Sequence, residues 1–161
     1  YQYLWKAAEA KPLDGLSQIT WLLDKSFYSV SSAVPENTRV VFAQIGANDP
    51  NFNLRNEDAF ILRANTTGGA SFVSVIEPHG EYNPTVEYTL GSHSQVASVE
   101  HFKNGAAEYV KVTTKSGDVV GLGIANNDDV AAQHSVKLNG KDVSWAGPYK
   151  LFHSSKNKNN R

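Results

Sequence analysis

The chain has 161 residues, of which 40% are hydrophobic and 19% are charged, and its formal net charge is −1. This length is typical of one domain and supplies enough apolar residues to form a core. The charge balance lacks the broad positive field of nucleic-acid-binding proteins, which excludes DNA and RNA as expected partners. No run reaches the roughly 18 apolar residues of a membrane helix, so we expect a soluble protein without membrane contact.

Cysteine is absent, which excludes disulfides and thiolate metal sites but leaves the cellular compartment open. The chain begins at Tyr1 and contains no methionine, so we interpret it as a fragment or a product of cleavage. We predict a single domain over residues 1–161 with a flexible polar tail over residues 154–161.

The first segment, Tyr1 to Glu9, fits either a strand or a short helix. From Phe27 onward, short β-branched or aromatic runs alternate with turn residues, which is typical of antiparallel strands at the spacing of a β-sandwich. Strands are predicted at residues 27–34, 39–45, 59–64, 71–76, 85–90, 96–102, 108–113, 118–125, 135–138, 141–145 and 149–152. The predicted fold class is therefore all-β, an antiparallel two-sheet β-sandwich.

The turn residues support this interpretation. Asn139-Gly140 separates two of the predicted strands, and both residues tolerate the positive φ of a type I′ hairpin turn. Proline lacks the N–H that a central strand needs, so we place the prolines between strands. These are Pro35, Pro50, Pro78, Pro84 and Pro148.

The segment from Ile45 to Arg55 is predicted to leave its strand at Gly46 and to form a rigid loop, because Asn and Asp side chains bond to nearby backbone. Its candidate ligands for sugar hydroxyls and carboxylates are Asn48, Asp49, Asn51, Asn53 and Arg55. Alternatively, these groups satisfy the loop itself or contact a neighbouring domain.

A second candidate site follows the strand predicted over residues 71–76. Glu77, His79 and Tyr82 place an acid, an imidazole and a phenol within one short loop. Groups of these kinds transfer protons in polysaccharide lyases. The alternative is a role in local structure or in an interface, which is common for residues at strand ends.

Other chemistry has no support in the sequence. The five histidines show no HxxxH or HxH spacing, and no G-x-S-x-G or phosphate-binding glycine motif occurs. The sequence therefore gives no reason to predict a metal ligand, a serine nucleophile or a cofactor in this chain. Several aromatic residues fit either sugar stacking or core packing: Trp5, Trp21, Trp145, Tyr82 and Tyr149.

Three runs resemble the C-terminal region of oligoalginate lyases of polysaccharide lyase family seventeen, in the heparinase II/III-like superfamily. They are QIGANDPNFNLR at residues 44–55, AFILR at 59–63 and SVIEPHG at 74–80. The resemblance implies a parent enzyme with an α/α toroid, a central β-sheet domain and a final β-sandwich. Such an enzyme cleaves alginate oligomers exolytically by β-elimination.

In that family the catalytic and zinc-binding residues lie in the toroid and the central sheet, so the resemblance assigns none of them to this chain. It implies that the two candidate sites dock onto those upstream domains or contact alginate oligosaccharide. It also implies a periplasmic or secreted location.

Two alternatives remain. The first is a stand-alone jelly-roll alginate lyase, because His101-Phe102-Lys103-Asn104-Gly105 is superficially similar to the Tyr-Phe-Lys-x-Gly segment of those enzymes. Its Gln-Ile-His partner motif is absent. In that hypothesis His101 and Tyr109 are the residues to test. The second is a carbohydrate-binding module, for which a row of exposed aromatic residues on one sheet face is diagnostic.

Overall fold

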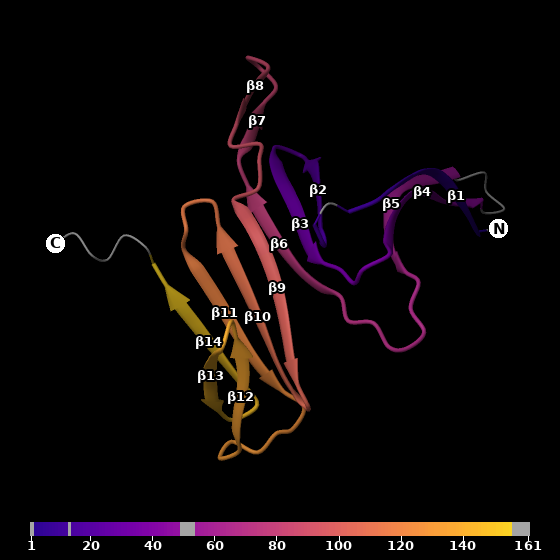
Figure 1. Ribbon diagram of the computed structural model, residues 1–161. Helices are drawn as coiled ribbons and strands as arrows, with labels where there is room; N and C mark the ends of the chain where they lie inside the picture. The colour runs from indigo at the N-terminus through magenta and orange to yellow at the C-terminus, as the bar shows by residue number, and fades with distance from the viewer. Residues whose placement is uncertain (1, 13, 49–53, 156–161) are drawn as a thin grey trace. The chain divides into compact units, whose positions relative to one another are not determined.

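The computed structural model describes residues 2–12, 14–48 and 54–155, and the chain forms two compact units (Figure 1). Unit 1 comprises Tyr1–Ser17 and Val34–Phe72, and unit 2 comprises Gln18–Ala33 and Val73–Arg161. The described residues form antiparallel strands and no helix. The predicted all-β antiparallel fold class is thus confirmed, whereas the single domain over residues 1–161 stays a prediction.

Unit 1 is built on a three-stranded sheet in the order β1-β4-β5. Its strands are β1 (Gln2–Ala10), β4 (Thr38–Asn48) and β5 (Leu54–Ala64). A register shift between Lys6 and Ala8 interrupts the pairing of β1 with β4. One extra residue at such a bulge places Lys6 and Glu9 on the same face of the sheet.

Unit 2 contains a four-stranded sheet in the order β14-β11-β10-β9 and a separate hairpin of β12 and β13. The sheet is formed by β9 (Val96–Asn104), β10 (Ala107–Thr114), β11 (Val119–Ala125) and β14 (Tyr149–Ser154). The hairpin is formed by β12 (Gln133–Leu138) and β13 (Lys141–Ala146). It covers one face of the sheet, which gives two packed β layers.

The core between these layers is formed by Ala107, Tyr109, Val136 and Trp145, and Tyr109 meets Phe152 edge to face at 5.5 Å between ring centroids. Two glycines of β11 make room for the large rings. A Cβ on Gly121 would collide with the ring and hydroxyl of Tyr109, and one on Gly123 would lie 2.7 Å from the Trp145 ring. The Gly121-Leu122-Gly123 run therefore serves packing.

Unit 2 also contains a three-stranded sheet in the order β2-β3-β6 and a short hairpin. The sheet is formed by β2 (Leu16–Leu23), β3 (Ser26–Ala33) and β6 (Val73–His79), and β2 begins within unit 1. The hairpin is formed by β7 (Glu81–Asn83) and β8 (Tyr88–Leu90). The centre of β3 is buried but polar, and its serines form side-chain hydrogen bonds: Ser31 accepts from Gln18, and Ser32 pairs with Ser74.

Several local predictions have clear outcomes. Asn139 and Gly140 both have positive φ, 47° and 84°, in the two-residue turn between β12 and β13, as predicted. The prediction that Pro78 lies between strands is wrong, because it pairs with Tyr28 inside β6. Since β6 is an edge strand, the missing N–H of Pro78 removes no ladder hydrogen bond.

The exit of the chain from its strand at Gly46 is also a wrong prediction. Gly46 pairs with Tyr3 and with Asn56 in the middle strand of unit 1, and a Cβ at this position would collide with the Tyr3 ring. The first segment, which the sequence left open, is strand β1. Strand β2 was not predicted.

Candidate functional site

Glu77 and His79 lie on the same side of β6, and both connect that strand to the segment before β9. Ser94 Oγ donates a hydrogen bond of 2.6 Å to Glu77 Oε2, and the Gln95 amide donates to both carboxylate oxygens at 3.0 and 3.1 Å. Burial raises the pKa of the Glu77 carboxyl, but these hydrogen bonds outweigh it and hold the pKa below its ordinary value. The ionised Glu77 carboxylate therefore links β6 to the segment before β9.

His79 belongs to a chain of hydrogen bonds that crosses the β2-β3-β6 sheet. Its Nδ1 donates to the Gly91 carbonyl at 2.8 Å, so in the neutral ring Nε2 accepts from Ser29 Oγ at 2.8 Å. The Thr20 hydroxyl then donates to Ser29 at 2.5 Å. Ser29 is 0% exposed, so its hydroxyl has no access to a substrate, and the partly exposed His79 ring is held between Ser29 and Gly91.

Tyr82 lies in β7 opposite Thr89, and its amide donates to the Lys25 carbonyl at 2.8 Å. Within the described part of the chain, no hydrogen bond or ring contact joins Tyr82 to Glu77 or His79. The structure thus brings two of the three predicted residues together and leaves the third apart.

The other predicted group falls at the end of the β4-β5 hairpin. Asn48 is the last residue of β4 and Arg55 is the second residue of β5. Asp49, Asn51 and Asn53 lie outside the described residues. Saccharide binding or docking by these five residues stays a prediction.

A feature that the sequence analysis missed is the second face of the four-stranded sheet in unit 2, which we call the open face. The pairing register places two rows of side chains on this face, each row with one residue from each of the four strands. The first is Lys103, Glu108, Ile124 and Tyr149, and the second is His101, Val110, Leu122 and Leu151. The core residues Tyr109 and Phe152 point to the opposite, covered face.

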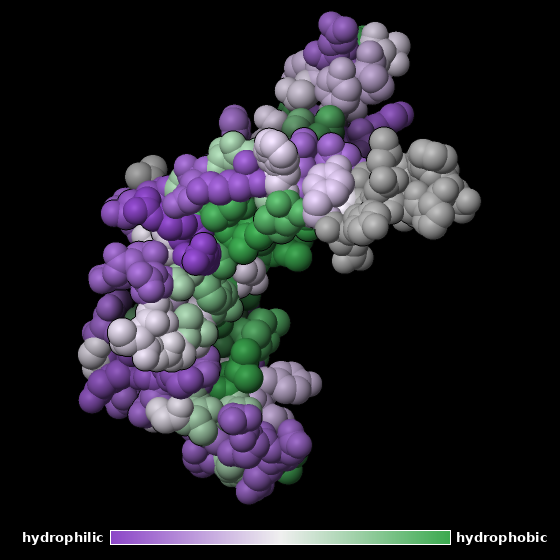
Figure 2. Space-filling view, turned by 90° about the vertical axis from the view of Figure 1, so that its right-hand side faces the viewer, coloured by the Kyte–Doolittle hydropathy of each residue, from purple (hydrophilic) through white to green (hydrophobic). Residues whose placement is uncertain are grey.

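The open face is apolar and becomes more exposed toward the edge strand β14. Val110 and Leu122 are partly buried, whereas Ile124 is 43%, Leu151 67% and Tyr149 72% exposed. Figure 2 shows hydrophobic side chains gathered at the surface of the molecule. Contiguous apolar surface with a polar rim is typical of an interaction site.

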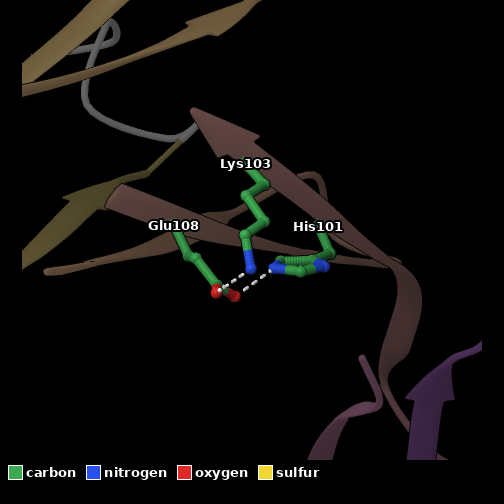
Figure 3. Close-up of polar contacts among 3 residues, drawn as sticks. All are labelled: His101, Lys103 and Glu108. Carbon is green, nitrogen blue, oxygen red and sulfur yellow. Dashed lines mark hydrogen bonds and ion pairs between the residues drawn. The ribbon is translucent and has the colours of Figure 1, made fainter. Parts of the chain in front are cut away.

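The polar rim of the open face consists of His101 and Lys103 on β9 and Glu108 on β10 (Figure 3). His101 Nε2 lies 2.7 Å from Glu108 Oε2, and Lys103 Nζ donates to Glu108 Oε1 at 3.0 Å. The hydrogen bonds from Lys103 and His101 hold the pKa of the Glu108 carboxyl below its ordinary value. An ionised carboxylate only accepts, so Nε2 of His101 carries a proton.

Next to this rim is a pocket of about 330 Å³, lined by Lys103, Glu108 and Ile124 among others. Tyr109 follows Glu108 directly but points into the core, is 5% exposed, and has its pKa raised by burial. His101 and Tyr109 therefore do not form a pair around one substrate. His101 on β9 pairs with Val110 on β10 and lies on the open face. Tyr109, the neighbour of Val110, points to the opposite face, because successive side chains of a strand alternate between faces.

Two further findings concern the described residues only. No three His, Asp or Glu side chains among them gather in an arrangement that could hold a metal ion. None of the described elements is a helix of sufficient length and hydrophobicity to cross a membrane.

An exposed apolar face on an antiparallel β-sheet is typical of a domain with an interaction surface. Residues 114–152, which include β11 to β13 and the first four residues of β14, match the family described as "Exo-oligoalginate lyase-like, C-terminal domain". Together with two relatives, this match confirms the predicted resemblance to a C-terminal domain of oligoalginate lyases.

Two relatives extend the match to almost the whole chain. An "Alginate lyase" of Stenotrophomonas maltophilia (strain K279a) is 36% identical over 156 residues, which is 97% of this chain. An "Exo-oligoalginate lyase" of Saccharophagus degradans (strain 2-40) is 38% identical over 150 residues, or 91% of this chain. The chain spans only about a fifth of the length of each relative, 21% and 20%.

Proposed function

We propose that this chain is a non-catalytic accessory domain of an alginate-cleaving lyase, and that its open face docks onto the rest of the same enzyme. The observation that carries the proposal is the exposure of Ile124, Tyr149 and Leu151 side by side on one sheet face. Burying such side chains contributes about 25 cal/mol per Å² of apolar surface, which favours a protein partner.

The polar residues support a structural role. β-Elimination at a uronate needs a base for the proton next to the carboxylate and a group that stabilises the developing negative charge. His79 is bonded between Ser29 and Gly91, and His101 is bonded to Glu108. Each imidazole therefore already has a partner within the domain.

The substrate class comes from the relatives. Both carry names of alginate-cleaving enzymes, and this chain matches about a fifth of each. We extend to the parent of this chain the cleavage of alginate oligomers by β-elimination, upstream toroid and central β-sheet domains, and a periplasmic or secreted location.

An activity assay tests the non-catalytic role. The isolated chain is incubated with alginate oligomers, and the absorbance of the new double bond is followed, with the full-length enzyme as a positive control. We expect turnover by the full-length enzyme and none by the chain alone. A rate from the chain that disappears in His101→Gln would instead support the stand-alone lyase.

One observation favours a second function, saccharide binding by unit 1. Tyr3, Trp5, Phe42 and Phe60 share one face of the β1-β4-β5 sheet by register, and Phe42 lies opposite Phe60. Trp5 is 68% and Tyr3 46% exposed. Exposed aromatic rings of this kind stack on the apolar faces of sugars.

This second function is tested by binding without turnover. Titration of the chain with alginate oligomers should perturb Trp fluorescence, and Trp5→Ala should remove the change. An equal fluorescence change in Trp5→Ala would assign the signal to another tryptophan and contradict saccharide stacking on Trp5.

A further inference from the structure

Unit 1 contains a pocket on the face of the β1-β4-β5 sheet opposite the aromatic residues Tyr3, Trp5, Phe42 and Phe60. It has a volume of about 510 Å³, and its lining includes Lys11, Arg39, Arg63, Asn37, Asn65 and Glu9. Three of these side chains are cationic and one is acidic. A ligand pocket typically has a volume of about 300 to 1,000 Å³, so this one has the size of a small-molecule site.

The two arginines face each other across the strand pair. Arg39 on β4 and Arg63 on β5 are direct partners in the antiparallel register. Like charges in this position destabilise a sheet. An anion that contacts both guanidinium groups would therefore relieve an unfavourable arrangement.

Glu9 offsets only part of this charge. Its carboxylate is hydrogen-bonded to Lys6, which is the main reason that the pKa of Glu9 lies below its ordinary value, and the charges of Arg39 and Arg63 lower this pKa further. The carboxylate also forms an ion pair with Arg39, 3.8 Å from its Nε. Within the described ranges, no carboxylate lies at ion-pair distance from Arg63 or Lys11. The pocket thus keeps an excess of positive charge.

We propose that this pocket binds the carboxylate of a uronate unit in an acidic oligosaccharide. A guanidinium group offers two parallel N–H donors that match a carboxylate, and the facing pair supplies two such groups. The side-chain amides of Asn37 and Asn65 line the same pocket and supply donors and acceptors for sugar hydroxyls. The choice of uronate rests on the alginate-cleaving parent proposed above.

This combination of groups discriminates between ligands. A neutral oligosaccharide offers no carboxylate for charge-assisted hydrogen bonds with the arginine pair. Inorganic phosphate carries charge but lacks the ring hydroxyls that would pair with the two amides. The site would give the domain a contact with the acidic polymer that is independent of the open face.

Isothermal titration of the 161-residue chain tests the proposal with uronate oligosaccharides, neutral glucose oligosaccharides and inorganic phosphate as separate probes. We expect saturable binding of the uronate alone, weakened by added salt because exposed charges are screened. Arg63→Gln and Arg39→Gln should each weaken it by about tenfold or more, since charge-assisted hydrogen bonds are lost. Lys141→Gln, an exposed cation on the β12-β13 hairpin, is the control and should leave it unchanged.

A stability measurement separates this role from a structural one. Without ligand, Arg63→Gln relieves the repulsion from Arg39 and should raise or leave unchanged the thermal midpoint of unfolding. A lowered midpoint, an absence of saturable uronate binding, equal binding of phosphate, or uronate binding unaffected by both arginine variants would overturn the proposal. Docking of the open face is measured separately, by protection of Tyr149 in the full-length enzyme, so either idea can fail alone.

Discussion

Glu77 Oε2 accepts a 2.6 Å hydrogen bond from Ser94 Oγ, so a carboxylate near the end of β6 holds the segment that leads into β9. Because hydrogen bonds from Ser94 and the Gln95 backbone lower the pKa of Glu77 despite burial, the ionised form is favoured by folding. We expect Glu77→Gln to lower the free energy of unfolding by about 1 to 2 kcal/mol at neutral pH. Urea unfolding monitored by Trp fluorescence measures this change.

The same variant gives a pH test. The pKa is lower in the folded than in the unfolded chain, so the stabilisation is present above the unfolded value of about 4.3 and is lost as pH falls through the folded pKa. The difference between wild type and Glu77→Gln should therefore shrink below about pH 4. Glu81→Gln, at an exposed acid of β7, is the control. A difference in the free energy of unfolding that does not change with pH would contradict stabilisation by the ionised Glu77 carboxylate.

The glycines of β11 give a second prediction. A methyl group at residue 123 meets the Trp145 ring, which is 2% exposed and has little room to move. Gly123→Ala should therefore destabilise the chain by about 1 to 3 kcal/mol, the usual effect of overpacking. Gly68→Ala is the matched control, because nothing lies within 4 Å of a Cβ there. Equal unfolding midpoints for the two variants would contradict the packing described.

The open face gives a third prediction. Leu151 and Val86 are both 67% exposed in this chain, but only Leu151 lies on the open face. In the isolated chain, Leu151→Lys and Val86→Lys should each change the free energy of unfolding by less than about 0.5 kcal/mol. In the full-length enzyme, Leu151→Lys should speed proteolytic release of the domain, because it buries a charge in the interface. Release at equal rates from both variants would count against docking.

Much of the fold was predictable, because runs of β-branched residues favour strands and Gly, Asn and Pro favour turns whatever the rest of the chain does. The Asn139-Gly140 turn and most strands after Phe27 followed from such local signals. The position of Pro78 inside a strand did not follow from them, because the sequence does not reveal that β6 is an edge strand. Strand β1 is Ala-rich and carried no clear period, so its type stayed open.

The candidate site was predicted less well. Glu77 and His79 were singled out together with Tyr82, but the hydrogen-bond partners of the first two, Ser94 and Ser29, are far away in sequence. The open face depends on the strand order β14-β11-β10-β9, and the facing of Arg39 and Arg63 depends on the β4-β5 register. The sequence showed only that Arg39 and Arg63 each lie near the end of a predicted strand. The pairing register of the two strands is needed to know that the arginines face each other.

The most direct measurement is hydroxyl-radical footprinting of the isolated chain and of the full-length enzyme. Tyr149 and Leu151 are 72% and 67% exposed in the chain, and Val86 and Val130 are 67% and 78% exposed. If the open face docks onto the rest of the enzyme, Tyr149 and Leu151 become strongly protected in the full-length protein, while Val86 and Val130 are oxidised equally in both. Equal oxidation of Tyr149 and Leu151 in the two proteins would contradict the docking role.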